Sequence, residues 1–344
     1  MKKNQPVRLE DIAKKLDVST VTVSKALRNH PDISVGTTER VKEIAEKMGY
    51  MPNFNARNLT SRRSNTIGLI VPKIAHIFFA TLIEAVYDIA FKNNYEIILM
   101  VSQEDAEIEN KHLLSLIAMR VDGIIISVTE DTKDLTTFKR IQNLGIPLLF
   151  VDRVLPLPDA SKVVVDDKDG AFVAIDYAAR RGYKKIAFLG GYSHINIANL
   201  RYQGFLEAMN YHKIPIKQKW IIEGGLGEED GYEGFMKLCK GGEVPEFVFA
   251  ITYPVALGLY VAAMEKGLRI PQDIEVTCFG KNTFNRYIPS IFNFIDQPAA
   301  ELAASAMELM MKQINNPRKF EPKEVTLKTQ LLVHSPFAKV ELGL

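Results

Sequence analysis

Short apolar runs of strand type recur along most of this chain and alternate with longer stretches of helical periodicity. The runs are too short for buried helices, and their content of Val, Ile and Phe favours β-strands. Strands that alternate with helices pair in parallel, because each helix returns the chain across the sheet in a right-handed crossover. The sequence after residue 65 therefore predicts a doubly wound α/β fold. The predicted strands are Thr66–Val71, Glu96–Val101, Gly123–Val128, Pro147–Val151, Lys162–Val165, Lys185–Leu189, Trp220–Glu223, Phe247–Ile251 and Ile274–Phe279.

The predicted strands form two successive sets, and the second set begins at Lys162–Val165. Helices predicted near residues 78–93, 107–119 and 133–144 separate strands of the first set. Two sets of this kind indicate two similar lobes with a cleft between them. A ligand of such sheets binds beyond the carboxyl ends of the strands, so we expect the loops there to form a binding site. These loops hold residues 72–76, 151–153, 166–167, 190–194, 252–253 and 280–282.

The first 50 residues follow a different pattern, in which three short helices succeed one another. In residues 9–16, LEDIAKKL, apolar side chains recur at helical spacing, and Ser19 can cap a second helix, TVTVSKAL. A third helix near residues 35–47, capped by Ser34, can close a small core. Two short helices joined by a tight turn are typical of a helix-turn-helix, whose second helix enters the major groove of DNA. The pattern therefore predicts a DNA-binding head.

The distribution of charge agrees with this prediction. Residues 1–65 carry 13 Lys and Arg against 7 Asp and Glu, whereas the rest of the chain carries 30 against 34. A basic head on a mildly acidic body is the electrostatic pattern expected when only the head meets phosphate.

Other classes of protein find little support. The opening residues MKKNQPVRLEDI lack the apolar core of a signal peptide, and no stretch approaches membrane-spanning length, so we expect a cytoplasmic protein without membrane contact. Cys239 and Cys278 lack metal-ligand spacing. The Asp166, Asp167 and Asp169 cluster is typical of a solvated turn, and no nucleophile has a recognisable catalytic partner. We therefore expect no metal, no cofactor and no enzymatic activity.

Several motifs, in order, give the chain a family resemblance. With DIAKKLDVSTVTVSKAL, ISVGTTERVKEIAEKMGYMPN, and ARNL followed by IGLIVP, the sequence from about Val7 to Phe337 resembles the lac repressor and galactose repressor (LacI–GalR) family of bacterial transcription regulators. The resemblance implies a helix-turn-helix head, a hinge helix, and a periplasmic-binding-protein-like body of two doubly wound parallel-sheet lobes, tied together by late segments that cross between them. The implied domains are residues 1–51 for the head, 52–65 for the hinge helix and linker, 66–163 with about 293–324 for the N-lobe, and 164–292 with about 325–340 for the C-lobe.

Contacts with DNA follow from the helix pattern and from the resemblance. By pattern, Thr20 and Val21 can reach base edges and Lys25 a guanine or a phosphate. By resemblance, two hinge helices of a dimer enter the minor groove, where Leu59 would pry apart the central base step. A helix this short is marginal alone, so we expect it to order only on DNA. The expected DNA-contacting residues are Ser19, Thr20, Val21, Thr22, Ser24, Lys25, Asn29, Tyr50, Asn53, Ala56, Arg57 and Leu59.

The resemblance also places an effector site in the cleft. The effector-binding arginine of the family matches Arg201, whose guanidinium can hold vicinal hydroxyls or a carboxylate through two hydrogen bonds. Asp152 matches an acidic position that meets sugar hydroxyls, and Phe78 and Phe79 match an aromatic pair beside the cleft. Trp220, the only tryptophan, can either stack on a ligand or pack in the core. The expected effector-binding residues are His76, Phe78, Phe79, Asp152, Arg201, Trp220, Thr252, Tyr253 and Lys281.

The chain departs from the family pattern inside the expected cleft. His76 stands where an asparagine is usual, Thr252-Tyr253 where Asn-Asp is usual, and Lys281 where an acid is usual. Because a lysine only donates hydrogen bonds, one hypothesis is an anionic effector, a sugar acid or sugar phosphate, held by Arg201 and Lys281. The alternative is that Lys281 points outward and the pocket has drifted, even to the loss of its effector.

From these features we expect a DNA-binding regulator of sugar or carbohydrate metabolism that acts as a repressor. It would bind a pseudo-palindromic operator as a homodimer, with the predicted helix near residues 78–93 at the dimer surface, and a small effector would control binding. One alternative is a regulator whose effector pocket is degenerate and which responds to a protein partner. Another is a carbohydrate-binding protein without a DNA role.

Overall fold

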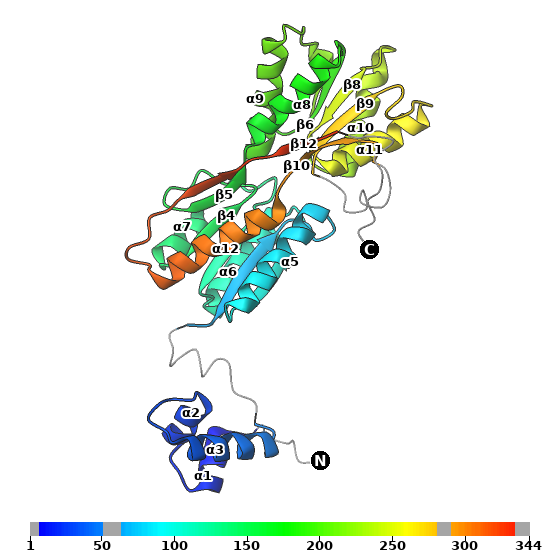
Figure 1. Cartoon of the computed structure of the whole chain (residues 1–344). Helices are drawn as coiled ribbons and strands as arrows, with labels where there is room; N and C mark the ends of the chain where they lie inside the picture. The colour runs from blue at the N-terminus through cyan, green and yellow to red at the C-terminus, as the bar shows by residue number, and fades with distance from the viewer. Residues whose placement is uncertain (1–6, 51–62, 281–289, 334–344) are drawn as a thin grey trace. The chain divides into compact units, whose positions relative to one another are not determined.

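The computed structural model describes residues 7–50, 63–280 and 290–333 of the chain (Figure 1). It divides into two compact units, Met1–Ser64 and Asn65–Leu344. The first unit is helical, and the second consists of two α/β lobes.

Three short helices build the part of the first unit that the structure describes. They are α1 (Leu9–Leu16), α2 (Thr20–Leu27) and α3 (Val35–Lys47). The hydroxyl oxygen of Ser19 accepts a hydrogen bond from the Thr22 backbone N–H at 3.0 Å, and that of Ser34 accepts one from the Thr37 N–H at 3.3 Å. Both serines thus satisfy an N–H group that the first helical turn leaves without a partner. The small apolar core of this unit consists of Ile12, Ala13, Val23, Ala26, Val41 and Ala45.

A sheet of six parallel strands forms the centre of the first lobe, in the order β11-β5-β4-β3-β1-β2. The strands are β1 (Thr66–Val71), β2 (Glu96–Val101), β3 (Gly123–Ile126), β4 (Leu148–Val151), β5 (Ser161–Val165) and β11 (Glu324–Leu327). Helices α5 (Ile77–Lys92) and α12 (Ala299–Asn315) cover one face, and α6 (Ala106–Met119) and α7 (Thr136–Asn143) cover the other. The central strands are apolar at nearly every position because both of their faces are buried.

The second lobe repeats this architecture, with the sheet order β12-β10-β9-β8-β6-β7. Among the described strands of this sheet, only β12 runs antiparallel to its neighbour. The strands are β6 (Ile186–Gly191), β7 (Ile221–Gly224), β8 (Phe247–Ala250), β9 (Glu275–Phe279), β10 (Asn293–Asp296) and β12 (Gln330–Leu332). The helices are α8 (Asp167–Arg180), α9 (Asn196–Tyr211), α10 (Glu228–Leu238) and α11 (Tyr253–Glu265), with the short 3₁₀ helices η1 (Gln218–Trp220) and η2 (Cys239–Gly241). The predicted doubly wound fold is confirmed in both lobes.

The structure corrects three assignments of strands to lobes. Residues 162–165 were expected to begin the second set of strands, but β5 pairs with β4 in the first sheet. Residues 293–296 were expected in the N-lobe, yet β10 pairs with β9 in the second sheet. Residues 324–327 span the expected boundary, and the whole of β11 pairs with β5 in the first sheet. The sequence pattern could not show this, because apolar runs predict strands but not their partners. In Figure 1 the segment with β11 and β12 passes from one sheet to the other.

Two glycines allow helices α10 and α11 to cross at very short range. A Cβ atom on Gly258 of α11 would overlap the carbonyl oxygen of Glu228, and one on Gly231 of α10 would overlap that of Val255. The contact atoms belong to the backbone, so no side-chain rotation can relieve the overlap. The two helices can therefore approach this closely only because both crossing positions are glycines without a side chain.

We expect Gly258→Ala to lower the free energy of unfolding of the body by about 1–3 kcal/mol, the usual cost of overpacking a tight core contact. The helices must separate, which also displaces Glu228 at the start of α10. Urea unfolding of the full chain measures the effect. Gly36→Ala is the matched control, since no atom lies within 4 Å of a Cβ there and alanine favours a helix over glycine. Equal stability of Gly258→Ala and the parent chain would contradict the close crossing.

Candidate functional site

The second helix of the first unit presents its N-terminal side chains to solvent. Ser19, Thr20 and Val21 are exposed, and 62% of the Val21 surface is accessible. Thr22 is half-buried, with its hydroxyl 2.8 Å from that of Ser19. Asn29 is exposed beyond the end of the helix and has a left-handed backbone, with φ at 54°. A small, exposed apolar side chain at the start of a capped helix is well placed to touch a thymine methyl group in a major groove.

Other predicted DNA contacts already have partners inside this unit. Ser24 accepts a hydrogen bond from the Arg28 guanidinium at 3.3 Å, and the Lys25 ammonium lies 2.7 Å from a carboxylate oxygen of Asp32. The Lys25–Asp32 pair is partly exposed, so phosphate can compete for the lysine at little cost. Tyr50 packs against the apolar core of the unit. Asn53, Ala56, Arg57 and Leu59 lie outside the described residues.

A cavity of about 360 Å³ lies between the two lobes of the body. It lies where β1, β4, β6, β8 and β9 end, the edge at which doubly wound sheets bind ligands. Its volume is at the small end of the roughly 300–1,000 Å³ usual for ligand pockets, which suits a ligand the size of a monosaccharide. The lining residues are Ala75, His76, Ile77, Phe78, Phe79, Asp152, Arg153, Ile197, Arg201, Leu226, Glu228, Thr252, Tyr253, Pro254, Leu257, Phe279, Gly280 and Gln297.

Arg201 of α9 is held at this cavity by a dense set of contacts. Its Nε and Nη2 atoms each lie 2.7 Å from Oδ1 of Asp167, and Nη1 donates to the carbonyl oxygen of Ile251 at 2.7 Å. The guanidinium carbon lies 3.7 Å from the centre of the Phe279 ring. Burial raises the pKa of Asp167 to about 6, although the Arg201 charge opposes the shift. The charge of Arg201 is thus matched within the protein before any ligand binds.

Asp152 and Arg153 follow the end of β4 on the first-lobe side of the cavity. Asp152 is buried and has a φ of 64°, a left-handed conformation that asparagine and aspartate tolerate better than most residues. Its Oδ1 accepts a long hydrogen bond of 3.4 Å from Gln297. Burial raises the pKa of Asp152, against the opposing charges of Arg153 and Arg201. The Arg153 Nη1 atom lies 2.9 and 2.8 Å from the two carboxylate oxygens of Glu104, so this arginine is also paired.

Aromatic rings line the first-lobe wall. Phe78 and Phe79 pack edge to face with ring centres 5.1 Å apart, and His76 stacks on Phe79. Burial and the charge of Arg153 lower the pKa of His76, which favours a neutral ring. On the second-lobe side, the Thr252 hydroxyl donates to the Leu226 carbonyl oxygen at 2.9 Å, and Tyr253 packs near Phe294. A flat ligand could therefore stack on rings while polar groups at the strand ends bind its edges.

Seven of the expected effector-binding residues line the cavity: His76, Phe78, Phe79, Asp152, Arg201, Thr252 and Tyr253. Trp220 does not. It ends η1 inside the core of the second lobe, with 1% of its surface exposed, so packing explains it and its assignment to the site was wrong. Lys281 lies outside the described residues.

The pattern missed several lining residues. Glu228 and Leu226 belong to the segment GGLGEEDG after β7, and Gln297 lies on the crossover to α12. The position of Glu228 at the first residue of a helix that follows a strand was the available signal. Gln297 carried no local signal, because only the pairing of β10 with the second sheet brings it to the cavity.

Other candidate sites of the sequence are accounted for by structure. Asp166 caps α8, accepting from the Asp169 N–H at 3.1 Å, and Asp167 pairs with Arg201. Within the described ranges, no three His, Cys, Asp or Glu side chains are grouped so that they could hold a metal ion. Among the same residues, no helix is long and apolar enough to cross a membrane.

Both units of the chain match known families. The body matches the family described as periplasmic binding proteins and sugar binding domain of LacI family, over residues 64–337. The head matches bacterial regulatory proteins, lacI family, over residues 8–53. The chain belongs to the LacI family. This LacI-family protein is therefore a DNA-binding transcription regulator rather than an enzyme.

Relatives of this LacI-family protein are similar along nearly their whole length. Catabolite control protein A of Priestia megaterium is 30% identical over 314 residues, which cover 90% of this chain and 93% of the relative. The probable HTH-type transcriptional repressor ExuR of Bacillus subtilis (strain 168) is 32% identical over 315 residues, with 90% and 92% covered. The structure of the lac repressor dimer bound to operator and the anti-inducer ONPF has a TM-score of 0.82 at 23% identity, with 96% and 98% covered. That likeness shows the shared fold.

Proposed function

We propose that this LacI-family regulator represses genes of carbohydrate metabolism in the bacterial cytoplasm, under the control of a small molecule bound between its lobes. The observation that carries the proposal is the cavity of about 360 Å³ at the strand ends, in a chain whose other unit is a helix-turn-helix head. Ser19, Thr20, Val21 and Asn29 would face the major groove. A ligand that shifts one lobe against the other would change the separation of the two hinge segments in a dimer, a coupling typically of about 1–3 kcal/mol.

The homodimer is part of the proposal, because a two-fold protein matches a pseudo-palindromic operator. Helix α5 of the first lobe offers a surface for it: Tyr87 and Phe91 are 51% and 65% exposed, with parallel rings 6.3 Å apart. Two large exposed aromatic side chains on one helix face are typical of a protein interface. The related lac repressor structure is described as a dimer.

A neutral, hydroxyl-rich ligand fits the described part of the cavity best. Arg153 and Arg201 are each paired with a carboxylate, whereas Asp152 and Glu228 add two further carboxylates at the cavity wall. Carboxylates accept hydrogen bonds from sugar hydroxyls and repel an anion. The apolar rings opposite would cover the face of a sugar or of a similarly flat ligand.

The anionic effector remains a second candidate, because two arginines line the cavity. It would require a ligand carboxylate or phosphate to compete with Asp167 or Glu104, or else a contribution from Lys281. The third candidate is a regulator whose effector pocket is degenerate and which responds to a protein partner. A carbohydrate-binding protein without a DNA role is disfavoured, since the head matches the family of DNA-binding regulators.

A thermal-shift screen of the full chain distinguishes these candidates. The panels are neutral sugars, sugar acids, sugar phosphates and nucleobases, and a ligand at about 100 times its Kd stabilises the bound unit by roughly 2.7 kcal/mol. Asp152→Asn is the matched variant, since asparagine keeps the left-handed backbone but removes the charge. We expect a neutral-sugar hit that the variant weakens. Hits among acids and phosphates only would favour the anionic candidate, and no hit in any panel would favour the protein-controlled regulator.

For the DNA surface, we expect Lys25→Ala to act in one of two recognisable ways on an operator selected from random duplexes. If Lys25 reads a guanine, base preference at one position relaxes; if it touches phosphate, the salt dependence of affinity falls by about one unit of slope.

Leu59→Ala tests in the same assay whether Leu59 intercalates between base pairs, with an expected loss of a few kcal/mol at most in binding free energy. Unchanged affinity of Leu59→Ala would remove Leu59 as an intercalating wedge.

A further inference from the structure

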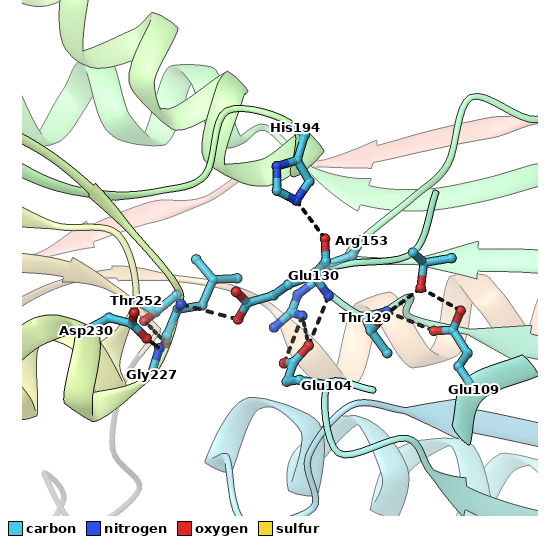
Figure 2. Close-up of polar contacts among 11 residues, drawn as sticks. Glu104, Glu109, Thr129, Glu130, Arg153, His194, Gly227, Asp230 and Thr252 are labelled. Carbon is cyan, nitrogen blue, oxygen red and sulfur yellow. Dashed lines mark hydrogen bonds and ion pairs between the residues drawn. The ribbon is translucent and has the colours of Figure 1, made fainter. Parts of the chain in front are cut away.

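One acidic side chain of the first lobe reaches across to the second lobe, behind the wall of the cavity. Glu130 lies in the loop after β3, and its Oε1 accepts a hydrogen bond from the Leu226 N–H at 3.2 Å. Its own carbonyl oxygen is 3.0 Å from Nε2 of His194, in the loop after β6. Figure 2 shows Glu130 between the Arg153–Glu104 pair on one side and the Gly227–Asp230 turn on the other. Glu130 therefore contacts the second lobe at two separate loops.

The donors in the second lobe are three successive backbone N–H groups, at residues 225–227 directly before α10. Gly225 and Gly227 donate to the two carboxylate oxygens of Asp230, at 2.7 and 3.1 Å, and Leu226 between them donates to Glu130. Consecutive N–H groups before a helix N-terminus form a concave site that favours carboxylates. Asp230 fills part of this site from within its own lobe, and Glu130 completes it from the other lobe.

The loop that carries the acceptor Glu130 is itself firmly held in the first lobe. The Glu130 N–H donates to Glu104 at 3.1 Å, and Glu104 is bound by Arg153 at 2.9 and 2.8 Å. Buried Glu109 accepts from the Thr129 N–H and from the Thr132 hydroxyl, both at 2.8 Å. The loop around Glu130 is thus anchored on both sides, so a movement of its lobe moves Glu130.

Leu226 connects this contact to the cavity. Its side chain is buried in the cavity wall, and its carbonyl oxygen accepts from the Thr252 hydroxyl, another lining group. Arg153, on the other side of Glu130, also lines the cavity. We infer that Glu130 is a positioning residue that latches the two lobes together and sets the Leu226–Thr252 wall of the effector cavity. The inference rests on the proposed function only where it names this cavity as the effector site. The contacts of Glu130 between the lobes need no ligand.

The surroundings of Glu130 make the latch sensitive to protons. It is faced by Arg153 from the loop after β4, Glu104 from the loop after β2, Asp230 from α10 and His194 from the loop after β6. Burial, with Glu104 and Asp230, raises the pKa of Glu130 to about 7, against the opposing Arg153 charge and the Leu226 N–H. When the lobes separate, the carboxyl meets water and its pKa falls towards its ordinary value near 4.5. Closure therefore takes up a proton, and the latch weakens as pH rises through 7.

Amide hydrogen exchange of the full chain without ligand tests the inference. Leu226 reports the latch itself, and Val154 reports closure elsewhere, because its N–H donates across the lobes to Asn196 Oδ1 at 3.0 Å. We expect Glu130→Ala to lower protection at both amides by about two- to tenfold, the usual range for one buried hydrogen bond. Glu130→Gln keeps an acceptor for Leu226 and is expected to restore both. Loss of protection at Leu226 alone would show a local bond and overturn the latch.

The pH profile provides the second readout. After correction for intrinsic exchange rates, protection of Val154 in the parent chain should fall about tenfold from pH 6 to pH 8, as the closed-state proton is lost. Glu130→Gln should be flat across this range. Glu109→Gln is the matched control: it removes a buried carboxyl of α6 whose pKa is also raised to about 7 and which binds the same loop, but with both partners in the first lobe. If protection of Val154 still fell with pH in Glu130→Gln, or became independent of pH in Glu109→Gln, the pH dependence could not be assigned to Glu130. A failed effector screen would leave these exchange results unchanged, so the two proposals fail separately.

Discussion

Asp167→Ala is expected to destabilise the body by about 3–5 kcal/mol, because it leaves a buried guanidinium without its counter-charge. Arg201 is 1% exposed and Asp167 is 2% exposed, and two guanidinium nitrogens lie 2.7 Å from the same carboxylate oxygen. The Ile251 carbonyl oxygen and the Phe279 ring would remain, but neither carries a charge. Urea unfolding of the full chain, followed by a probe of the body, measures the loss.

Two variants make this prediction specific to the ion pair. Asp166→Ala changes the adjacent residue and removes only the side-chain cap of α8, with an expected cost of about 1 kcal/mol. Asp167→Asn keeps the size and an acceptor oxygen, so it should fold even where the alanine variant does not, yet remain well below the parent chain in stability. If Asp167→Ala cost no more than Asp166→Ala, the pair would not be the structural anchor of the cavity.

Ile12→Ala is expected to weaken operator binding strongly while the body stays folded. Ile12 is fully buried in a head whose core has few residues, and truncation of such a side chain costs about 2–5 kcal/mol. A domain of roughly 50 residues has a stability of only a few kcal/mol, so most of it is lost. Fluorescence anisotropy with an operator selected from random duplexes should show an affinity at least about tenfold lower, since every 1.4 kcal/mol is a factor of ten.

Val21→Ala is the matched control for the head. It shortens an apolar side chain on the next helix that is exposed rather than buried. The head should therefore stay folded, and only base preference should change if Val21 meets a base edge. Full operator affinity in Ile12→Ala would show that the helices are held together by something other than this core.

The sequence predicted the elements of the fold far better than their pairing. Strand and helix existence follows from local periodicity, which is why the helix-turn-helix and the two doubly wound lobes were found. Strand order is decided by contacts between distant segments, and these have no local signature. Thus β10 was placed in the wrong lobe and the expected lobe boundaries cut through β5 and β11, although each was recognised as extended or as part of a crossover.

The same distinction separates the site residues that could be predicted from those that could not. Residues at strand ends, such as Asp152 and Thr252, could be found because the fold class alone brings strand ends to one edge. Trp220 instead lies directly before β7, at the start of the strand rather than at its carboxyl end, and its ring turns into the core. Two features have no trace in the sequence. One is the pairing of Arg201 with Asp167, and the other is the reach of Glu130 across the lobes, since both depend on how helices and lobes pack.

The crossing strands bear on how the chain can fold as it is synthesised. The sheet of the first lobe needs β11 at its edge, and the face of that sheet opposite α6 needs α12, yet both follow the second lobe in the sequence. A chain emerging from its N-terminus therefore displays a half-covered first sheet until almost all of its residues have left the ribosome. During that interval the apolar face that α12 later covers is open to water and to other chains. Truncation before residue 299 should consequently yield an aggregating fragment rather than a smaller soluble lobe.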